Sequence, residues 1–149
     1  MQNLLHSCSY VNRNFDTQIA AICVAARETY VNRVDGKIAV VTGGTQGLGA
    51  AIALQLAEAG AVGVITCGRN AGKGQAVAAA IQAKTGCDVR FVQADLEHVA
   101  DCRRVFDALD AAFGRVDILV NAAGITDRGD ILSTDQALFD RMFAVNTRA

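Results

Sequence analysis

Thr42-Gly43-Gly44-Thr45-Gln46-Gly47-Leu48-Gly49 is the stretch that decides the fold of this chain of 149 residues. An apolar, β-branched run at residues 37–42 leads into it, which is typical of a buried strand. After it, apolar residues recur at helical spacing up to Gly60, where a glycine that ends a helix is expected. The glycine cluster is therefore predicted to form a tight turn between a strand and a helix.

Strands and helices alternate along the rest of the chain. The pattern predicts further strands at residues 62–67, 88–93 and 116–120, with helices between them that end at Gly86 and Gly114. Such alternation requires parallel strands joined by right-handed crossovers, with helices on both faces of the sheet. The predicted fold class is therefore α/β, a doubly wound parallel sheet.

Two expectations concern the C-terminal part of the chain. Residues 116–120 are almost wholly apolar and are expected to form an exposed edge strand, the kind that recruits other chains. A last helix is predicted to open at Ser133, because Gln136 three residues later completes a capping-box pattern. Its buried side chains are expected to be Leu138, Met142 and Val145.

Residues 1–34 differ from the rest and are interpreted as an N-terminal extension, helical or disordered, ahead of one α/β domain at residues 35–149. Apolar residues at helical spacing predict an amphipathic helix from about residue 16 to residue 33. The extension carries no recognisable chemistry. It fits a helical arm, an interaction arm, or translated sequence upstream of the true start.

Composition excludes several classes of function. A net charge of −1 gives no general attraction to nucleic acid or to acidic membranes, and no apolar run approaches the roughly 20 residues that span a bilayer. The five cysteines are odd in number and never in C-x-x-C spacing, which favours reduced thiols in a cytoplasmic protein. His6 and His98 form no metal-binding pair, so no metal site is predicted.

The glycine turn indicates a site for a diphosphate. Gly43 permits the tight turn, Gly47 lets the backbone approach a diphosphate, and Gly49 lets the helix pack closely. The free N–H groups at the helix start, at the positive end of its dipole, would then face the phosphates. An ordinary tight turn is the alternative. The strand before and the helix after favour a dinucleotide site.

The spacing G-x-x-x-G-x-G combines with three further motifs: Asp95-Leu96 after the third strand, Asn121-Ala-Ala-Gly124 after the fourth, and Val145-Asn146 in the last helix. Together they resemble the short-chain dehydrogenase/reductase family over residues 35–149. The resemblance implies a Rossmann-type sheet, incomplete at its C-terminal side, and an oxidoreductase that transfers hydride between NAD(P) and a small carbonyl or alcohol substrate. It assigns cofactor binding to Gly43, Thr45, Gln46, Gly47, Leu48, Gly49, Arg69, Asp95, Leu96, Asn121, Ala122, Ala123 and Gly124.

Arg69 points to NADP rather than NAD as the cofactor. An acidic residue about 20 positions after the glycines would favour NAD, whereas this chain has an arginine there and no carboxylate between Gly60 and Asp88. A guanidinium offers a planar fork of donors to a 2′-phosphate. Gln46 tempers the preference, since NADP-preferring relatives often carry a basic residue at that point. A solvated surface arginine is the alternative for Arg69.

The resemblance implies roles for the other matched residues. Asp95 would contact the adenine ring, although it could also cap the following helix. Asn121 to Gly124 would line the nicotinamide-ribose side, with Ala122 replacing an asparagine of the family motif, so that any hydrogen bond of that amide must come from elsewhere. Asn146 would be catalytic by positioning an active-site lysine and a relay water; an asparagine satisfied by local backbone is the alternative.

The family's catalytic Tyr-x-x-x-Lys pair lies downstream of the Asn146 position, and this chain ends at Ala149. Its tyrosines, Tyr10 and Tyr30, lack a lysine four residues later, so the chain is expected to bind cofactor without turnover. A full-length form is expected to be a homo-oligomer. The alternatives are a non-catalytic nucleotide-binding module, a truncated product that pairs with a full-length partner, and an incomplete gene product.

Overall fold

The computed structural model describes residues 33–127, 129–130 and 132–148. Contacts divide the chain into residues 1–33 and residues 34–149, and only the second unit is described below. The helix expected from about residue 16 to residue 33 lies outside the described residues, apart from its last position. In the part of the chain that is described, no helix combines the length and apolarity needed to cross a membrane.

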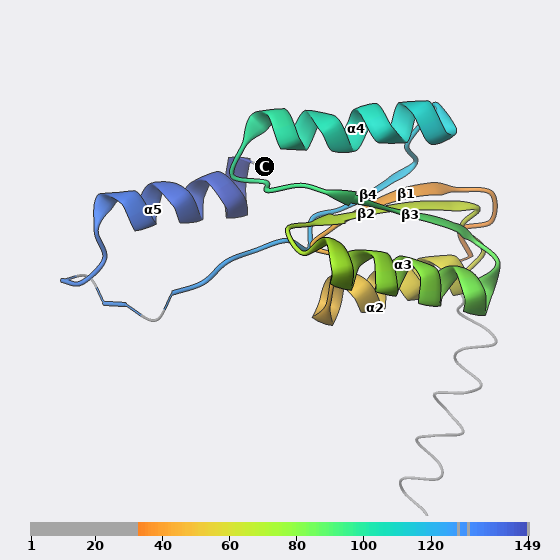
Figure 1. Cartoon of the computed structure of the whole chain (residues 1–149), viewed down its shortest axis with the longest axis horizontal. Helices are drawn as coiled ribbons and strands as arrows, with labels where there is room; N and C mark the ends of the chain where they lie inside the picture. Colours follow the sequence, from red (N-terminus) through yellow and green to blue (C-terminus); the bar gives the residue numbers. More distant parts are fainter. Residues whose placement is uncertain (1–32, 128, 131, 149) are drawn as a thin grey trace, which may run out of the picture. The chain divides into compact units, whose positions relative to one another are not determined.

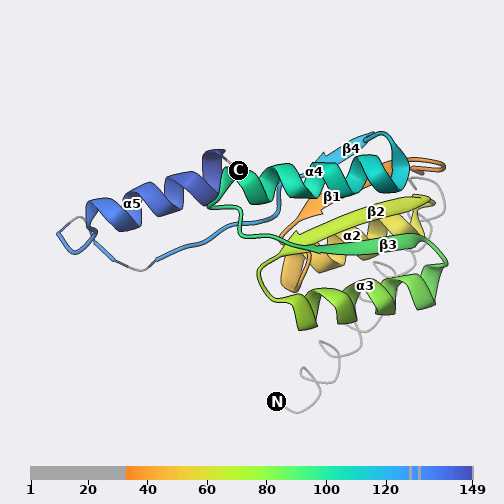
Figure 2. The same ribbon diagram turned by 45° about the horizontal axis from the view of Figure 1, so that its top comes forward.

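Four parallel strands form one sheet: β1 (Ile38–Thr42), β2 (Gly63–Gly68), β3 (Asp88–Gln93) and β4 (Ile118–Val120). Their spatial order is β3-β2-β1-β4, so the chain winds outward from β1 in both directions (Figure 2). Each strand lies within two residues of its predicted position. The predicted doubly wound parallel sheet is confirmed.

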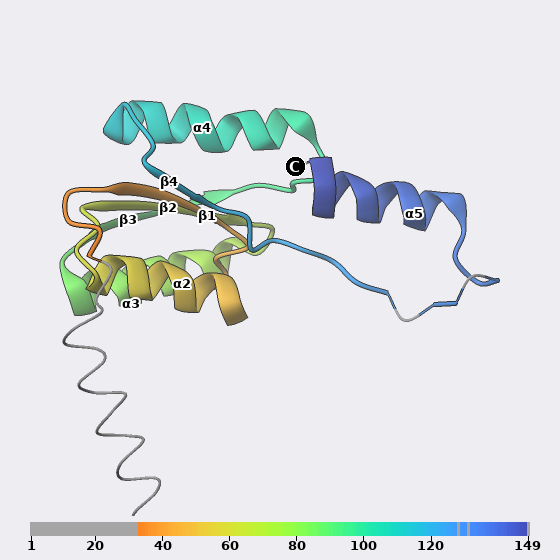
Figure 3. The same ribbon diagram turned by 180° about the vertical axis from the view of Figure 1, so that it is seen from behind.

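Helices cover both faces of this sheet. The helices α2 (Gly47–Glu58) and α3 (Ala71–Thr85) lie on one face, and α4 (Val99–Phe113) lies on the other (Figures 1 and 3). As predicted, α3 and α4 end at glycines in the left-handed conformation, Gly86 and Gly114. The helix α2 differs slightly from its prediction: its C-cap is Ala59, and the expected glycine, Gly60 at φ +102°, follows one residue later.

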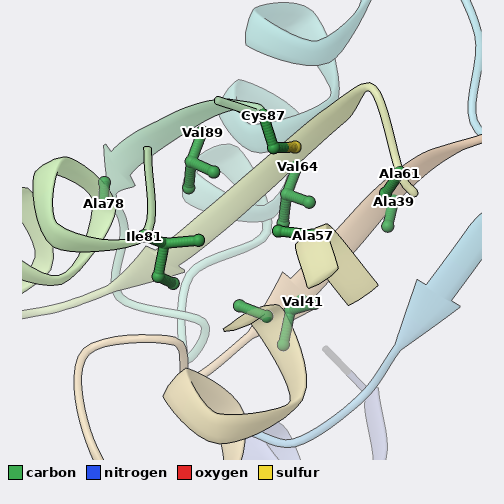
Figure 4. Packing of buried hydrophobic residues seen from close by; sticks show 10 residues of the cluster. Ala39, Val41, Ala57, Ala61, Val64, Ala78, Ile81, Cys87 and Val89 are labelled. Atoms are coloured by element: carbon green, nitrogen blue, oxygen red, sulfur yellow. The ribbon is translucent and has the colours of Figure 1, made fainter. Parts of the chain in front are cut away.

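The sheet is buried on both faces, which explains the continuous apolar run of β1. Ala39 and Val41 pack with Val64, Ile81 and other residues in a core beneath α2 and α3 (Figure 4). The alternate residues of β1 pack on the opposite face, in a second core that α4 closes with Val105 and Leu109. Because both faces are covered, both sets of alternate residues in β1 are apolar as far as Val41, and only Thr42 at the end of the strand is polar.

The C-terminal helix differs from its prediction. The helix α5 spans Gln136–Phe143 and is followed by a π-helical turn, Ala144–Arg148. Its N-cap is Asp135, whose side chain accepts a hydrogen bond from the Leu138 N–H at 2.8 Å. The predicted start at Ser133 is wrong, because the Ser133 hydroxyl instead bonds to the Asp130 carboxylate at 2.9 Å. No residue of α5 itself is buried, and its predicted core residues are only half-buried.

β4 joins β1 through a carboxylate as well as through its backbone. Asp117 accepts a hydrogen bond from the Ile38 N–H at 2.8 Å, and its own N–H donates to the Ile38 carbonyl at 2.9 Å. The hydrogen bond from the Ile38 N–H is the main reason why the pKa of Asp117 is lowered, and the nearby Arg115 guanidinium lowers it further. Leu119 of this outer strand is 51% exposed, as expected for an apolar edge among the described strands.

Candidate functional site

A crevice of about 300 Å³ opens at the carboxyl ends of the strands. This is where ligands bind to open α/β sheets whose strand order reverses, as it does here between β1 and β4. Most residues proposed from the sequence as cofactor ligands line it: Gly43, Thr45, Gln46, Gly47, Arg69, Asp95, Leu96, Ala122, Ala123 and Gly124. Sites that lie far apart in the sequence therefore meet in one place.

The glycine turn forms one wall of the crevice, and its glycines have different roles. A Cβ on Gly43 would lie 2.8 Å from the Ala123 Cα, and a Cβ on Gly49 would overlap the Gly43 carbonyl oxygen. Close packing within the protein therefore requires both. Gly47, by contrast, has φ +57° and nothing within 4 Å of its missing Cβ, so it leaves open space in front of the backbone.

The start of α2 is suited to an anion. The N-cap residue Gln46 makes no side-chain capping bond, and the first turn of α2 contains no acidic residue. The first N–H groups of a helix have no partner within the helix, and they lie at the positive end of its dipole. The open space at Gly47 and these N–H groups together form a cradle with positive potential, which can accept an anion.

The opposite wall is tied to β1 by one hydroxyl. Thr42 Oγ1 accepts hydrogen bonds from the Ala122 N–H at 3.1 Å and from the Ala123 N–H at 3.0 Å. Ala122 packs on the apolar core beneath the sheet. The side-chain amide lost at Ala122 is therefore not needed for this tie, because two backbone N–H groups make it.

Asp95 lines the crevice but does not cap α4. Its Oδ1 accepts a hydrogen bond from the Glu97 N–H at 3.2 Å, and its own N–H donates to Asp101 Oδ2 at 2.8 Å. The N-cap of α4 is His98, which makes no side-chain capping bond. The capping alternative for Asp95 is wrong, and its carboxylate is held in a local turn at the edge of the crevice.

Arg69 follows β2 and is exposed at the crevice. Its backbone carbonyl accepts a hydrogen bond from Gln93 Nε2 at 3.0 Å, while no hydrogen bond or ion pair holds its guanidinium among the described residues.

Nearby, Cys67 is buried beneath the glycine turn, and burial raises the pKa of its thiol to about 11. The thiol is thus neutral at physiological pH and is a poor nucleophile there.

Comparison with known proteins identifies this arrangement. The family model described as short chain dehydrogenase matches residues 37–149. The chain belongs to the short-chain dehydrogenase/reductase family.

Individual relatives are similar over the same region. A short chain dehydrogenase/reductase of Aspergillus novofumigatus is 40% identical over 116 residues, which are 78% of this chain and 44% of the relative. The crystal structure of L-sorbose reductase from Gluconobacter frateurii, complexed with NADPH and L-sorbose, matches with a TM-score of 0.77 and 27% identity over 80% of this chain and 45% of that one. A metagenomic short-chain oxidoreductase in complex with NADP matches with a TM-score of 0.70 and 36% identity over 76% and 51%. This chain therefore spans about half the length of the proteins it matches, or less.

Asn146, which the family resemblance marks as catalytic, bonds to one residue on the far side of the crevice. Its Oδ1 accepts from the Ile125 N–H at 2.8 Å, and its Nδ2 donates to the Ile125 carbonyl at 2.9 Å. Asn146 itself does not line the crevice, whereas its neighbour Val145 does. In this member of the dehydrogenase family the asparagine side chain thus holds the segment after β4 against the π-helical turn.

A few predicted residues lie outside the lining, and a few lining residues were missed. Leu48 is 71% exposed and Asn121 is also exposed, and neither of them, nor Gly49, lines the crevice. The missed residues are Gly68, Ala94, Ile125 and Val145. Each adjoins a predicted residue in the sequence, so widening every motif by one residue would have found them.

Within the described ranges, no group of three His, Cys, Asp or Glu side chains is placed to hold a metal.

Proposed function

We propose that this chain binds NADP(H) and forms the cofactor-binding part of an oxidoreductase that interconverts a carbonyl and an alcohol. The observation that carries the proposal is the crevice at the carboxyl ends of β1 and β4, with an open glycine turn on one wall and the Arg69 guanidinium at its end. When bound, the nicotinamide would supply or accept the hydride.

Each part of the crevice has a role in this proposal. The cradle at Gly47 and the start of α2 would hold the diphosphate, and the carboxylate of Asp95 would contact the adenine end. The backbone from Ala122 to Gly124, fixed by Thr42, would line the nicotinamide-ribose side. Asn146 would act by keeping Ile125, and with it this wall, in place.

Preference for NADP over NAD rests on the charge at the adenosine-ribose end. Arg69 has no carboxylate partner among the described residues, and an acidic residue that would accept ribose hydroxyls is missing after β2. A guanidinium is a strong, planar donor to phosphate. The NADPH and NADP complexes of the two similar structures support the same preference.

The proposal assigns cofactor binding, but not turnover, to these 149 residues. Proton exchange with a carbonyl needs an acid whose pKa is tuned, and neither Tyr10 nor Tyr30 is followed by a lysine four residues later. We also propose that the full-length protein acts on a small carbonyl or alcohol substrate. We propose further that it is cytoplasmic and forms a homo-oligomer. The free thiols of Cys67, Cys87 and Cys102 support a reducing location.

Titration of the chain with NADPH and NADH tests this function. We expect NADPH to bind at least about tenfold more tightly, since a charge-assisted contact to phosphate contributes about 1.5–3 kcal/mol. Arg69→Gln should weaken NADPH binding about tenfold and leave NADH affinity within about twofold. Arg103→Gln on α4, away from the crevice lining, is the matched control and should change neither affinity. Failure to bind either nucleotide would refute the proposal.

A further inference from the structure

A second hollow lies beside the crevice, and we refer to it as the side pocket. It is lined by Thr45, Gln46, Arg69, Asn70 and Lys73 and has a volume of about 470 Å³. These residues come from three elements: the glycine turn, the end of β2 and the first turn of α3. Thr45, Gln46 and Arg69 also line the crevice, so the two spaces are continuous at these residues.

Lys73 brings a second positive charge to the side pocket. Its Nζ donates a hydrogen bond to Gln46 Oε1 at 2.9 Å, which links α3 to the glycine turn. The partner is a neutral amide, and none of the residues lining the side pocket is acidic. Lys84, on the same helix, instead pairs with the Glu58 carboxylate at 2.7 Å. The charge of Lys73 is thus positioned without being neutralised.

Other groups add to the positive potential of the side pocket. The Arg69 guanidinium has no partner among the described residues, and α3 begins beside it at the Asn70 N-cap. The Asn70 side chain accepts a hydrogen bond from the Lys73 N–H at 2.9 Å, but the first turn of α3 contains no acidic residue, so no charge offsets the helix dipole there. A guanidinium, an ammonium and a helix start together favour a ligand with two negative charges, such as a phosphate monoester.

We propose that Lys73 is a specificity-determining residue for the 2′-phosphate of NADP(H), and that Gln46 holds its ammonium in place. The inference rests on the proposed function, because it places that phosphate in the side pocket. It also explains how the glycine turn dispenses with a basic residue at Gln46. The Gln46 side chain holds the ammonium of Lys73, so the positive charge comes from α3 instead of from the glycine turn.

The test compares Lys73→Gln with Lys73→Arg in the full chain, using NADPH, NADH, 2′,5′-ADP and 5′-AMP as ligands. Lys73→Gln should weaken NADPH and 2′,5′-ADP about five- to tenfold and leave NADH and 5′-AMP within about twofold. It should also reduce the salt dependence of NADPH binding, since one cation fewer meets the phosphate. Lys73→Arg should retain most of the affinity. Lys84→Gln, on the same helix, is the control for loss of a lysine charge.

The outcomes separate this inference from the proposed function. If the unaltered chain binds neither dinucleotide, the proposed function fails first. If it prefers NADPH and loses that preference with Arg69→Gln but not with Lys73→Gln, the inference alone is overturned. Equal weakening of NADPH and NADH by Lys73→Gln also overturns it, because the lysine would then be merely structural. Gln46→Leu tests the same pair from the turn and should cause a smaller loss, specific to NADPH, with circular dichroism verifying the fold.

Discussion

The two walls of the crevice are held by different forces. At the glycine turn, backbone atoms are in van der Waals contact, so that a Cβ on Gly43 would lie 2.8 Å from the Ala123 Cα. On the far wall, formed by Ile125 and Val145, a polar side chain makes the connection, because Asn146 bonds to the backbone of Ile125. Steric contact fixes a position rigidly, whereas exposed hydrogen bonds can exchange with water at low cost.

Burial differs between the walls in the same way. β1, which leads into the glycine turn, is buried over four of its five residues, while α5 on the far side has no buried residue. The rings of Phe139 and Phe143 in α5 contact each other with centroids 5.4 Å apart, yet each side chain is 55% exposed. We therefore expect the turn to share the stability of the core, and the far wall, which depends on a few side-chain contacts, to open locally at lower free energy.

The largest effect is expected where sterics dominate. Gly49→Ala places a Cβ on the Gly43 carbonyl oxygen, so the turn must shift. We expect a loss of about 3 kcal/mol in the free energy of unfolding, measured by urea denaturation, together with loss of NADPH binding.

Gly72→Ala is the matched control for that substitution. Gly72 lies in the first turn of α3, and its Cβ would meet only the Asn70 side chain at 3.7 Å. Alanine should therefore raise stability by up to about 1 kcal/mol through helix propensity. If both substitutions had the same effect, the steric account of the turn would be wrong.

A smaller and more local effect is expected on the far wall. Asn146→Ala removes both hydrogen bonds to Ile125. Hydrogen exchange at the Ile125 amide should accelerate about tenfold, which corresponds to about 1.4 kcal/mol. Exchange at Val40 and Ile65 in the sheet should not change. A lower free energy of global unfolding, or faster exchange throughout the sheet, would show that the two walls are one cooperative unit.

The smallest effect concerns Asp117, an exposed carboxylate that accepts a hydrogen bond from the Ile38 N–H at the start of β1. Its pKa is lowered in the folded state, so its contribution to stability is present above the ordinary value of about 4 and is lost as the pH falls through the folded pKa. Asp117→Asn should therefore lower the melting temperature at pH 7, and the difference from the unaltered chain should shrink at pH 3. A difference independent of pH would exclude ionisation of Asp117 as its cause.

The features that could be predicted from the sequence are those encoded by local pattern. β-branched runs and the glycines at residues 43, 47, 86 and 114 predicted the strands, the turn and the ends of two helices, because each depends on backbone conformation at one place. The alternation of strands and helices, joined by right-handed crossovers, predicted that the strands are parallel, as the sheet shows.

Features that depend on contacts distant in sequence could not be predicted in this way. Lys73 reaches Gln46 across 27 positions, and Asp117 reaches Ile38 across 79. Capping of α5 was misread because Ser133 and Asp135 are both good capping residues, and the nearby Asp130 carboxylate decides between them. Partial exposure of α5 also escaped prediction, since apolar spacing shows which face is apolar but not what covers it.

The bond pair between Asn146 and Ile125 has one more consequence. A carboxamide carries the same donor and acceptor as a peptide group. The Asn146 side chain therefore takes the place of a residue on a neighbouring strand. Ile125 is thereby paired as it would be inside a sheet, although the described residues place no strand beside it. The chain can thus continue past the end of β4 with the backbone hydrogen bonds of Ile125 supplied by one side chain instead of a neighbouring strand.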